Sequence, residues 1–352
     1  MSYSKLNGVR ITGMCAAFPK NEEDNRVVAQ ELGVDDIDKF IDIVGVKRRY
    51  VAINRQTSSD LCYESARSIL AGMAVDPSTI DALLFVSQTP DYIQPSTACV
   101  LHGRLGLQKS ALAFDINLGC SGFVYGLSVA ASFICGMGLK RVLLLVGDIL
   151  RKNKTVDPKD TLLFGDVGTA TLIEAGDGII ESALFTDGTG YKNLIIPGGG
   201  TRRTYQEGDS FLEITKPEMD GESVMAFTIT EVPKAFKVFF ANNGKQVSDY
   251  DYCILHQANK QMIQYIAKKV KIPAEKLPIS MDRYGNTNGS SIPVTLADLC
   301  EHGVEKEKLS IIASGFGIGL SWGIVSFDIE VKNVLPIIHT DAVFTEGYRG
   351  KF

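Results

Sequence analysis

Residues 115–126 read Asp115-Ile-Asn-Leu-Gly-Cys120-Ser-Gly-Phe-Val-Tyr-Gly126 and join the end of an apolar strand to the start of an apolar helix. Glycines on both sides of Cys120 allow a sharp turn, so we expect the thiol at the N-terminus of the helix. Unpaired N–H groups and the helix dipole favour a thiolate at that place. The stretch predicts a strand–turn–helix unit. Its cysteine thiolate can accept an acyl group and can later act as the leaving group when that acyl group is transferred.

Strands and helices alternate on both sides of this unit, which predicts an α/β fold. Several predicted strands are apolar throughout, which is typical of strands buried on both faces of a sheet between helices. The predicted strands are Gly8–Met14, Ala82–Ser87, Ala113–Ile116, Val142–Val146, Thr169–Glu174, Ile179–Phe185, Tyr252–Leu255, Leu309–Ala313 and Trp322–Ile329. The predicted helices are Asp60–Ala74, Ser96–Leu105, Ser121–Gly136, Met225–Asn242, Lys260–Val270 and Ile292–His302.

The two halves of the chain resemble distant copies of one unit. Val142 follows Cys120 by 22 residues, and Ile311 follows Gly289 by the same number. We therefore divide the chain into residues 1–178, residues 179–331 and a C-terminal tail of residues 332–352, to which the sequence assigns no role. The irregular stretch Tyr191–Glu222 is interpreted as an excursion that covers a site, with a mobile surface loop as the alternative.

Composition excludes several classes of protein. The chain has 352 residues, 45% hydrophobic and 22% charged, with a net charge of −5. Nucleic-acid binding is not expected, because it needs clustered lysine and arginine, and Lys47-Arg48-Arg49 is interpreted as a solvated turn. No signal peptide and no membrane span are predicted.

Cysteine and histidine usage points to a reduced, cytoplasmic protein. Seven cysteines without CxxC spacing do not form a disulfide framework, and four scattered histidines support no metal site. Apart from Cys120, we expect the cysteines to pack in the core, namely Cys15, Cys62, Cys99, Cys135, Cys253 and Cys300.

Two further segments place polar side chains where chemistry is possible. Ile254-Leu-His256-Gln-Ala-Asn259 follows an apolar strand, and strand ends present functional side chains in α/β proteins. Its histidine can equally be a core residue. Tyr284-Gly-Asn286-Thr-Asn-Gly-Ser-Ser-Ile-Pro293 enters a helix through Ser290-Ser291, which alone favours a capping loop over a catalytic one.

A glycine-rich stretch near the C-terminus reads Ala313-Ser-Gly-Phe-Gly-Ile-Gly-Leu-Ser-Trp-Gly323. Its glycines allow the backbone to approach another group closely. A phosphate cradle is the rival interpretation, but the stretch lacks lysine and no clear helix follows it. Backbone donors for a developing oxyanion fit it better.

Together, these segments resemble the ketoacyl-ACP synthase III branch of the thiolase superfamily, over about residues 8–329. Phe164-Gly-Asp166 and Asp157-Pro158 are further landmarks of the resemblance. It implies a thiolase fold, with two pseudo-duplicated βαβαβαββ halves in a layered α-β-α-β-α arrangement. It also implies a homodimer, and no metal or redox cofactor.

The resemblance implies an acyltransferase with Cys120 as nucleophile and His256 and Asn286 as its catalytic partners. An acyl group moves from an acyl-CoA or acyl-carrier-protein thioester to Cys120, and a malonyl thioester then loses CO₂ and condenses with it, in fatty acid or specialised-metabolite (polyketide) biosynthesis. The backbone N–H groups of Cys120 and Ile318 form the oxyanion hole. Asn286, and the absence of a glutamate in Ser87–Pro90, favour decarboxylative condensation over a hydroxymethylglutaryl-CoA-synthase-like reaction.

The chain also departs from this family. Asp38–Gly45 lacks the Trp and Arg that usually hold coenzyme A, Asp157–Thr161 lacks another Arg, and Gln261 replaces a basic residue that docks the carrier protein. We therefore expect a starter other than acetyl-CoA. Two alternatives remain open: an acyltransferase acting on an alcohol or amine, and a non-catalytic partner subunit. A generic nucleotide-binding protein is not expected, because no Gly-rich phosphate motif follows a strand and opens a helix.

Overall fold

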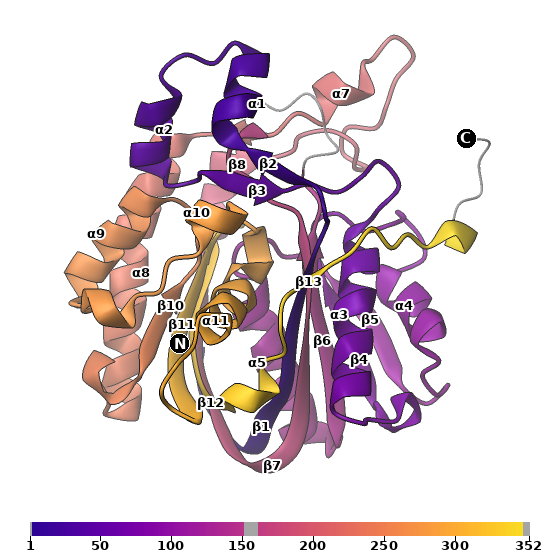
Figure 1. Cartoon of the computed structure of the whole chain (residues 1–352), viewed down its shortest axis with the longest axis vertical. Helices are drawn as coiled ribbons and strands as arrows, with labels where there is room; N and C mark the ends of the chain where they lie inside the picture. Colours follow the sequence, from indigo (N-terminus) through magenta and orange to yellow (C-terminus); the bar gives the residue numbers. More distant parts are fainter. Residues whose placement is uncertain (1, 151–160, 348–352) are drawn as a thin grey trace.

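The computed structural model describes residues 2–150 and 161–347, and nine strands within these ranges form one mixed sheet (Figure 1). Seven of them follow the order β10-β11-β12-β7-β6-β4-β5, and β1 pairs with both β7 and β13. The N-terminal strands are β1 (Ser2–Phe18), β4 (Ala82–Val86), β5 (Leu112–Ile116), β6 (Arg141–Asp148) and β7 (Val167–Thr186). The later strands are β10 (Tyr252–Leu255), β11 (Lys308–Gly317), β12 (Ser321–Glu330) and β13 (Ile338–His339).

The strand pairing repeats in the two halves of the sheet. In the first half β4 runs parallel to β6, which is antiparallel to β7. In the second half β10 runs parallel to β11, which is antiparallel to β12. This repetition agrees with the two similar halves expected from the sequence.

Helices lie in three layers around the sheet because the strands are apolar on both faces. The central layer holds α5 (Gly122–Met137) and α11 (Ser291–Glu301), which share one buried cluster with strands of both halves. The outer layers pack on the opposite faces and appear at the two sides of Figure 1. They contain α3 (Ser58–Gly72) and α4 (Thr97–Leu105) on one side, and α8 (Gly221–Asn243) and α9 (Lys260–Val270) on the other.

Alternating residues of β6 show how the layers are specified. Leu144 and Val146 face α5 and α11, whereas Leu143 and Leu145 face α3 and α4. Even-numbered and odd-numbered residues of β6 therefore pack in two different cores. This explains why the strand is apolar at every position.

The sequence predicted two strands where the structure has the single strand β7. Residues Gly176 to Gly178 interrupted the apolar pattern, but the backbone remains extended through them. The extra residues bulge out of the pairing with β1, because the step from Asn7 to Val9 faces the longer stretch from Ile179 to Ala175 of β7. The predicted boundary between residues 178 and 179 falls inside β7, and the division into two domains remains a prediction.

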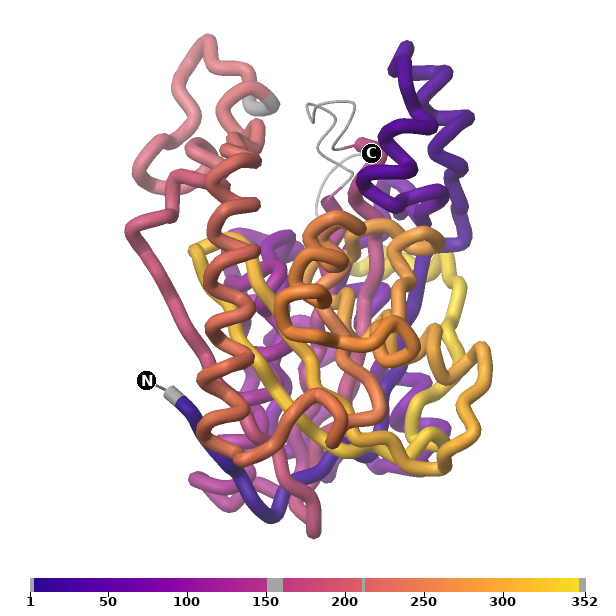
Figure 2. The backbone as a smooth tube through the Cα atoms, turned by 90° about the vertical axis from the view of Figure 1, so that its left-hand side faces the viewer, coloured from indigo at the N-terminus to yellow at the C-terminus, as the bar shows by residue number. Residues whose placement is uncertain are grey.

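Two small substructures stand at the same end of the molecule, as Figure 2 shows. One is N-terminal and contains β2 (Glu22–Asp24), α1 (Asn25–Leu32), α2 (Ile37–Val44) and β3 (Arg48–Tyr50). The other belongs to the excursion between β7 and α8 and contains β8 (Leu194–Ile195), α7 (Phe211–Ile214) and β9 (Glu218–Met219). A short helix, α10 (Met281–Tyr284), precedes the loop that carries Asn286.

The prediction that Lys47-Arg48-Arg49 forms a solvated turn is wrong for Arg49. This side chain is fully buried in β3, where it pairs with Glu23 at 3.0 Å and donates to Asn25 Oδ1 at 2.7 Å. Its Cγ also lies against Gly285, one residue before Asn286. Pairing of β3 with β2 turns Arg49, the last residue of the basic run and the middle residue of β3, inward.

The expectation that six cysteines pack in the core holds for only some of them. Cys15, Cys62 and Cys253 are buried and Cys300 is half-buried, but Cys99 and Cys135 are exposed. The two exposed thiols belong to α4 and α5, and their sulfur atoms lie 3.8 Å from the Ala113 carbonyl and 3.3 Å from the Asn7 carbonyl.

The C-terminal tail, which had no predicted role, runs back over the N-terminal half. Ile338 and His339 pair in parallel with the end of β1. Further along, the Phe344 N–H donates to Asp60 Oδ1 at 3.0 Å, and Tyr92 donates its hydroxyl to the Gly347 carbonyl at 2.6 Å. None of the helices described is both long enough and apolar enough to cross a membrane.

Candidate active site

Cys120 lies between β5 and α5, at the position predicted for it. The Gly122 N–H donates to the Gly119 carbonyl at 2.7 Å, which closes the turn that presents the thiol. Ser121 precedes the first helical residue, but its hydroxyl bonds Ser321 Oγ at 2.6 Å and does not cap the helix. The thiol therefore stands at the beginning of a 16-residue helix in the central layer.

The turn between β11 and β12 lies directly against this thiol. A methyl group at Gly317 would come within 2.7 Å of Cys120 Sγ, so only glycine fits there without displacing the sulfur. The backbone N–H groups of Ile318 and of Cys120 itself lie close enough to the sulfur to lower the pKa of the thiol. The two predicted backbone donors are thus brought together at one sulfur atom.

His256 is buried at the end of β10 and faces the same turn. Its N–H donates to the Ser314 carbonyl at 2.8 Å, and its ring packs edge-on against Phe316 with 5.4 Å between centroids. Ser291 Oγ lies 2.8 Å from His256 Nδ1. When that hydroxyl donates to Nδ1, the ring proton is on Nε2, where it can be donated to a substrate.

Asn286 is also buried, and its backbone is fixed to the strand bridge at Phe164. The Asn286 N–H donates to the Leu163 carbonyl at 2.9 Å, and the Gly165 N–H donates to the Asn286 carbonyl at 3.1 Å. The Asn288 N–H donates to Asn286 Oδ1 at 2.9 Å. Since the amide oxygen is occupied, the Asn286 NH₂ group is the part that remains for a ligand.

The prediction that Ser290 and Ser291 cap α11 is wrong. Neither hydroxyl makes a cap hydrogen bond. Ser290 instead donates to the Val146 carbonyl on β6 at 2.8 Å, and Ser291 contacts His256. Gly289, from the same loop, lies against the Gly119 carbonyl, which connects the Asn286 loop to the Cys120 turn.

Burial sets the protonation states at this site. It raises the pKa of Cys120 to about 11, and the negative Asp148 adds to the increase, although the Ile318 and Cys120 N–H groups oppose it. The expected resting thiolate is therefore not found, because burial outweighs the N–H groups at the start of the helix. Burial lowers the pKa of His256 to about 3, so its imidazole is neutral at physiological pH.

Sequence reasoning missed two polar residues next to these groups. Asp148, at the end of β6, is buried and accepts a hydrogen bond from Asn288 Nδ2 at 2.8 Å. Gln88 Oε1 lies against Gly119. Asp148 was missed because it is the last residue of a strand that was identified by its apolar residues. Gln88 was missed because the loop after β4 was searched only for a glutamate.

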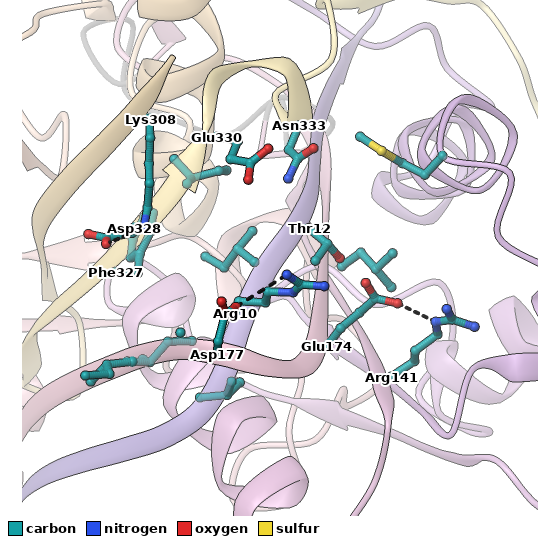
Figure 3. A pocket seen from close by; sticks show the side chains of 18 of the residues that line it. Arg10, Thr12, Arg141, Glu174, Asp177, Lys308, Phe327, Asp328, Glu330 and Asn333 are labelled. Carbon is teal, nitrogen blue, oxygen red and sulfur yellow. Dashed lines mark hydrogen bonds and ion pairs between the residues drawn. The ribbon is translucent and has the colours of Figure 1, made fainter. Parts of the chain in front are cut away.

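A separate cavity of about 500 Å³ contains none of the predicted site residues (Figure 3). Its charged side chains pair with each other. Arg10 binds Asp177 at 3.4 Å, Lys308 binds Asp328 at 2.9 Å, and Arg141 pairs with Glu174. Because these charges are matched within the cavity wall, we place no chemistry there.

Comparison with known proteins agrees with this geometry. Residues 114–188 match the family model of 3-oxoacyl-[acyl-carrier-protein] synthase III, and residues 240–329 match its C-terminal model. The beta-ketoacyl-[acyl-carrier-protein] synthase III of Clostridium acetobutylicum is 32% identical, over 90% of this chain and 98% of the relative. That of Caldanaerobacter subterraneus is 34% identical, over 82% of this chain and 88% of the relative.

The chain belongs to the 3-oxoacyl-ACP synthase III family. A crystal structure of a 3-oxoacyl-(acyl-carrier protein) synthase from Burkholderia xenovorans superposes with a TM-score of 0.89, at 35% identity, and covers 96% of this chain and 99% of that one. The thiolase fold and the recognition of a condensing, acyl-transferring enzyme are confirmed.

The segments in which the sequence analysis expected contacts to coenzyme A and to a carrier protein can be placed on the structure of this synthase III. Asp38–Gly45 forms α2 and its C-cap without Trp or Arg. Gln261, at the start of α9, is exposed, and Lys260 precedes it. Of Asp157–Thr161, residues 157–160, with the landmark Asp157-Pro158, lie outside the described residues.

Proposed function

We propose that this synthase III loads an acyl group from a thioester onto Cys120 and condenses it with a malonyl thioester, with loss of CO₂. The observation that carries the proposal is the arrangement at the thiol. The Ile318 and Cys120 N–H groups lie close to the sulfur, the His256 ring packs against Phe316 just before the Ile318 turn, and the Asn286 loop contacts the Cys120 turn through Gly289. Four segments that are distant in the sequence thus supply a nucleophile and donors for a developing oxyanion.

Loading exchanges one thiol for another. The Cys120 sulfur attacks the acyl carbonyl, the C–S bond to the carrier breaks, and the departing thiol takes up the proton. The backbone N–H groups of Cys120 and Ile318 stabilise the tetrahedral oxyanion. A covalent intermediate separates one difficult reaction into two easier ones.

Condensation uses the two side-chain donors. The malonyl carboxylate leaves as CO₂, and its bonding electrons form an enolate whose oxygen accepts from His256 Nε2 and from Asn286 Nδ2. The enolate carbon attacks the acyl carbonyl, the C–S bond to Cys120 breaks, and the released thiolate takes a proton from water. A neutral imidazole protonated on Nε2 suits this role because it donates a hydrogen bond to the enolate oxygen and keeps its proton.

The nucleophile is tested by mass spectrometry. The purified protein is incubated with acyl-CoA and acyl-carrier-protein thioesters, and we expect an acyl adduct on Cys120 that is absent in Cys120→Ala. The adduct mass also identifies the starter. If no thioester labels Cys120, the loading step is contradicted, and a non-catalytic partner subunit becomes the better interpretation.

Loss of the donors should separate the two steps. In His256→Ala and Asn286→Ala, condensation should fall about 10²–10³-fold, the usual cost of one oxyanion donor, while loading of Cys120 continues. Condensation is measured as CO₂ release and product mass from a malonyl thioester. An alcohol or amine that accepts the acyl group without CO₂ release would instead favour the acyltransferase alternative.

We also propose a starter other than acetyl-CoA, delivered by an acyl carrier protein or as a different acyl thioester. Support comes from α2, which contains neither a Trp nor an Arg to suit adenine and phosphate, and whose Phe40 ring packs against the cluster of Val28, Ala29 and Leu162. Efficient priming with acetyl-CoA would contradict this.

The homodimer is a further part of the proposal. Strand β5 lies at one edge of the sheet, its side chains are exposed or half-buried, and the nearby Ile93 is 95% exposed. An apolar edge strand is a template for pairing with another copy. Light scattering of the purified protein tests whether it is a dimer.

We propose a reducing cytoplasmic setting as well, which seven unpaired cysteines support.

A further inference from the structure

Asp148 is the most heavily hydrogen-bonded carboxylate beside the site. It closes β6 and is 2% exposed. Its Oδ1 accepts from the Gln88 N–H at 2.7 Å, from Ser87 Oγ at 3.0 Å and from Thr89 Oγ1 at 3.2 Å. The other oxygen, Oδ2, accepts from Asn288 Nδ2 at 2.8 Å.

Asn288 connects this carboxylate to both condensation donors. Its backbone N–H donates to Asn286 Oδ1, so the Asn286 NH₂ group points away from Asn288. Its backbone also lies beside the His256 ring, where it raises the pKa of the imidazole against the larger effect of burial. Asn288 has φ 50°, a conformation that asparagine tolerates better than most residues, and the bond to Asp148 fixes its side chain there.

We propose that Asp148 is a positioning residue for condensation: through Asn288 it holds Asn286 and His256 in the orientation in which both donate to the malonyl thioester oxygen. This inference rests on the proposed function and deepens it. Asp148 does not touch the reacting atoms in this role, and loading depends on the backbone donors at Cys120 instead. Removing the Asp148–Asn288 bond should therefore impair condensation more than loading.

Charge gives a second, independent readout. Asp148 is the negative group whose field raises the pKa of Cys120. Replacing it with a neutral residue should make the thiol easier to ionise, although condensation becomes slower. A residue that only supported the fold would not change these two properties in opposite directions.

Asp148 titrates closer to neutral pH than the thiol of Cys120 or the imidazole of His256. Burial raises its pKa to about 6. Around it, Cys120 and His256 have pKa values of about 11 and about 3, and burial raises the pKa of Cys62 on α3 far above its ordinary range. The loop after β4 contributes hydroxyl and amide groups from Ser87, Gln88 and Thr89.

The test exchanges the two residues of the Asp148–Asn288 hydrogen bond. Asp148→Asn places an amide donor against the Asn288 donor, and Asn288→Asp places two carboxylates together. The double variant Asp148→Asn with Asn288→Asp restores one donor and one acceptor. Asp177→Asn, a carboxylate whose side chain is 94% exposed, is the matched control.

Each variant is examined for loading of Cys120, for CO₂ release and for the rate of Cys120 alkylation by iodoacetamide. We expect each single variant to lose about 10- to 100-fold in condensation, part of the cost of losing an oxyanion donor, with loading within a fewfold of wild type. The double variant should recover most of the condensation. Alkylation should be severalfold faster in Asp148→Asn at pH 8.

Three results would count against the inference. Single variants that condense at the wild-type rate overturn it, as do equal losses in loading and condensation, or a double variant no better than the singles. A wild-type protein that loads Cys120 but never releases CO₂ from a malonyl thioester overturns the proposed function instead. Thermal melting of every variant separates these results from misfolding.

Discussion

At the scale of single residues, the site combines a neutral thiol with a neutral imidazole. Both states follow from burial, which disfavours the charged form of each group. A resting thiol exchanges with an incoming thioester without net transfer of a proton to the protein. Ionisation is then needed only when an acyl group arrives.

This protonation state predicts the pH dependence of alkylation. Because the thiolate is the reactive form and the pKa of Cys120 is about 11, its alkylation by iodoacetamide should increase about tenfold per pH unit between pH 7 and 9. Peptide mass spectrometry distinguishes Cys120 from the exposed Cys99 and Cys135. A plateau already at pH 8 would show that the thiol is more acidic than its burial implies.

The residues of the candidate site that belong to short sequence motifs were predictable. Cys120, His256, Asn286 and Ile318 each stand in a short, recognisable segment, and the structure brings these segments together. Asp148 and Asn288 were not predictable, because their importance depends on a hydrogen bond between residues 140 positions apart. No local pattern of residue types encodes such a contact.

At the scale of elements, the turn between β11 and β12 has the tightest contact with the nucleophile. Gly317→Ala would place a methyl group 2.7 Å from Cys120 Sγ. Displacing a reacting atom by about 1 Å can cost 10²-fold in rate, so we expect loading to fall by about this factor. Time-resolved intact mass of the acyl-enzyme measures it.

Gly103→Ala is the control for this change. A methyl group at Gly103, in α4, meets no atom within 4 Å. It should leave loading unchanged and stabilise the protein by about 0.5–1 kcal/mol, because glycine weakens a helix interior. Equal loading by Gly317→Ala and the wild type would mean that the turn moves freely away from the sulfur.

The elements themselves were largely predictable, because continuous apolar runs mark strands buried on two faces. The predicted strand Tyr252–Leu255 and the predicted helix Lys260–Val270 have the observed bounds. The helices α1 and α2 were missed because each has only eight residues and few buried side chains. Short elements are stabilised by packing more than by their own pattern.

At the scale of the whole molecule, the tail fastens the N-terminal half. The Arg104 guanidinium lies between the rings of Tyr63 and Phe344, 4.4 and 4.3 Å from their centroids, and binds Asp60 at 3.1 Å. This arrangement joins α3, α4 and the tail, which are distant in the sequence.

Phe344→Ala should therefore lower the free energy of unfolding by about 1 kcal/mol, the usual size of one cation–π contact. Thermal unfolding measures the change, and Tyr205→Ala, which removes a ring that is 58% exposed, should have little effect. Identical melting of Phe344→Ala and the wild type would show that the tail does not contribute to stability.

The long strand β7 has a consequence for how this molecule can be assembled. Its first part pairs with β6 and its last part with β12, and β1 runs along both. Two polypeptides separated at residue 178 would each end in a broken strand, and each would expose backbone groups that are paired in the intact chain. Although the halves repeat one pattern, neither is a building block that can be exchanged, and an engineer who wishes to recombine this enzyme with a relative should choose crossover points in loops outside residues 167–186.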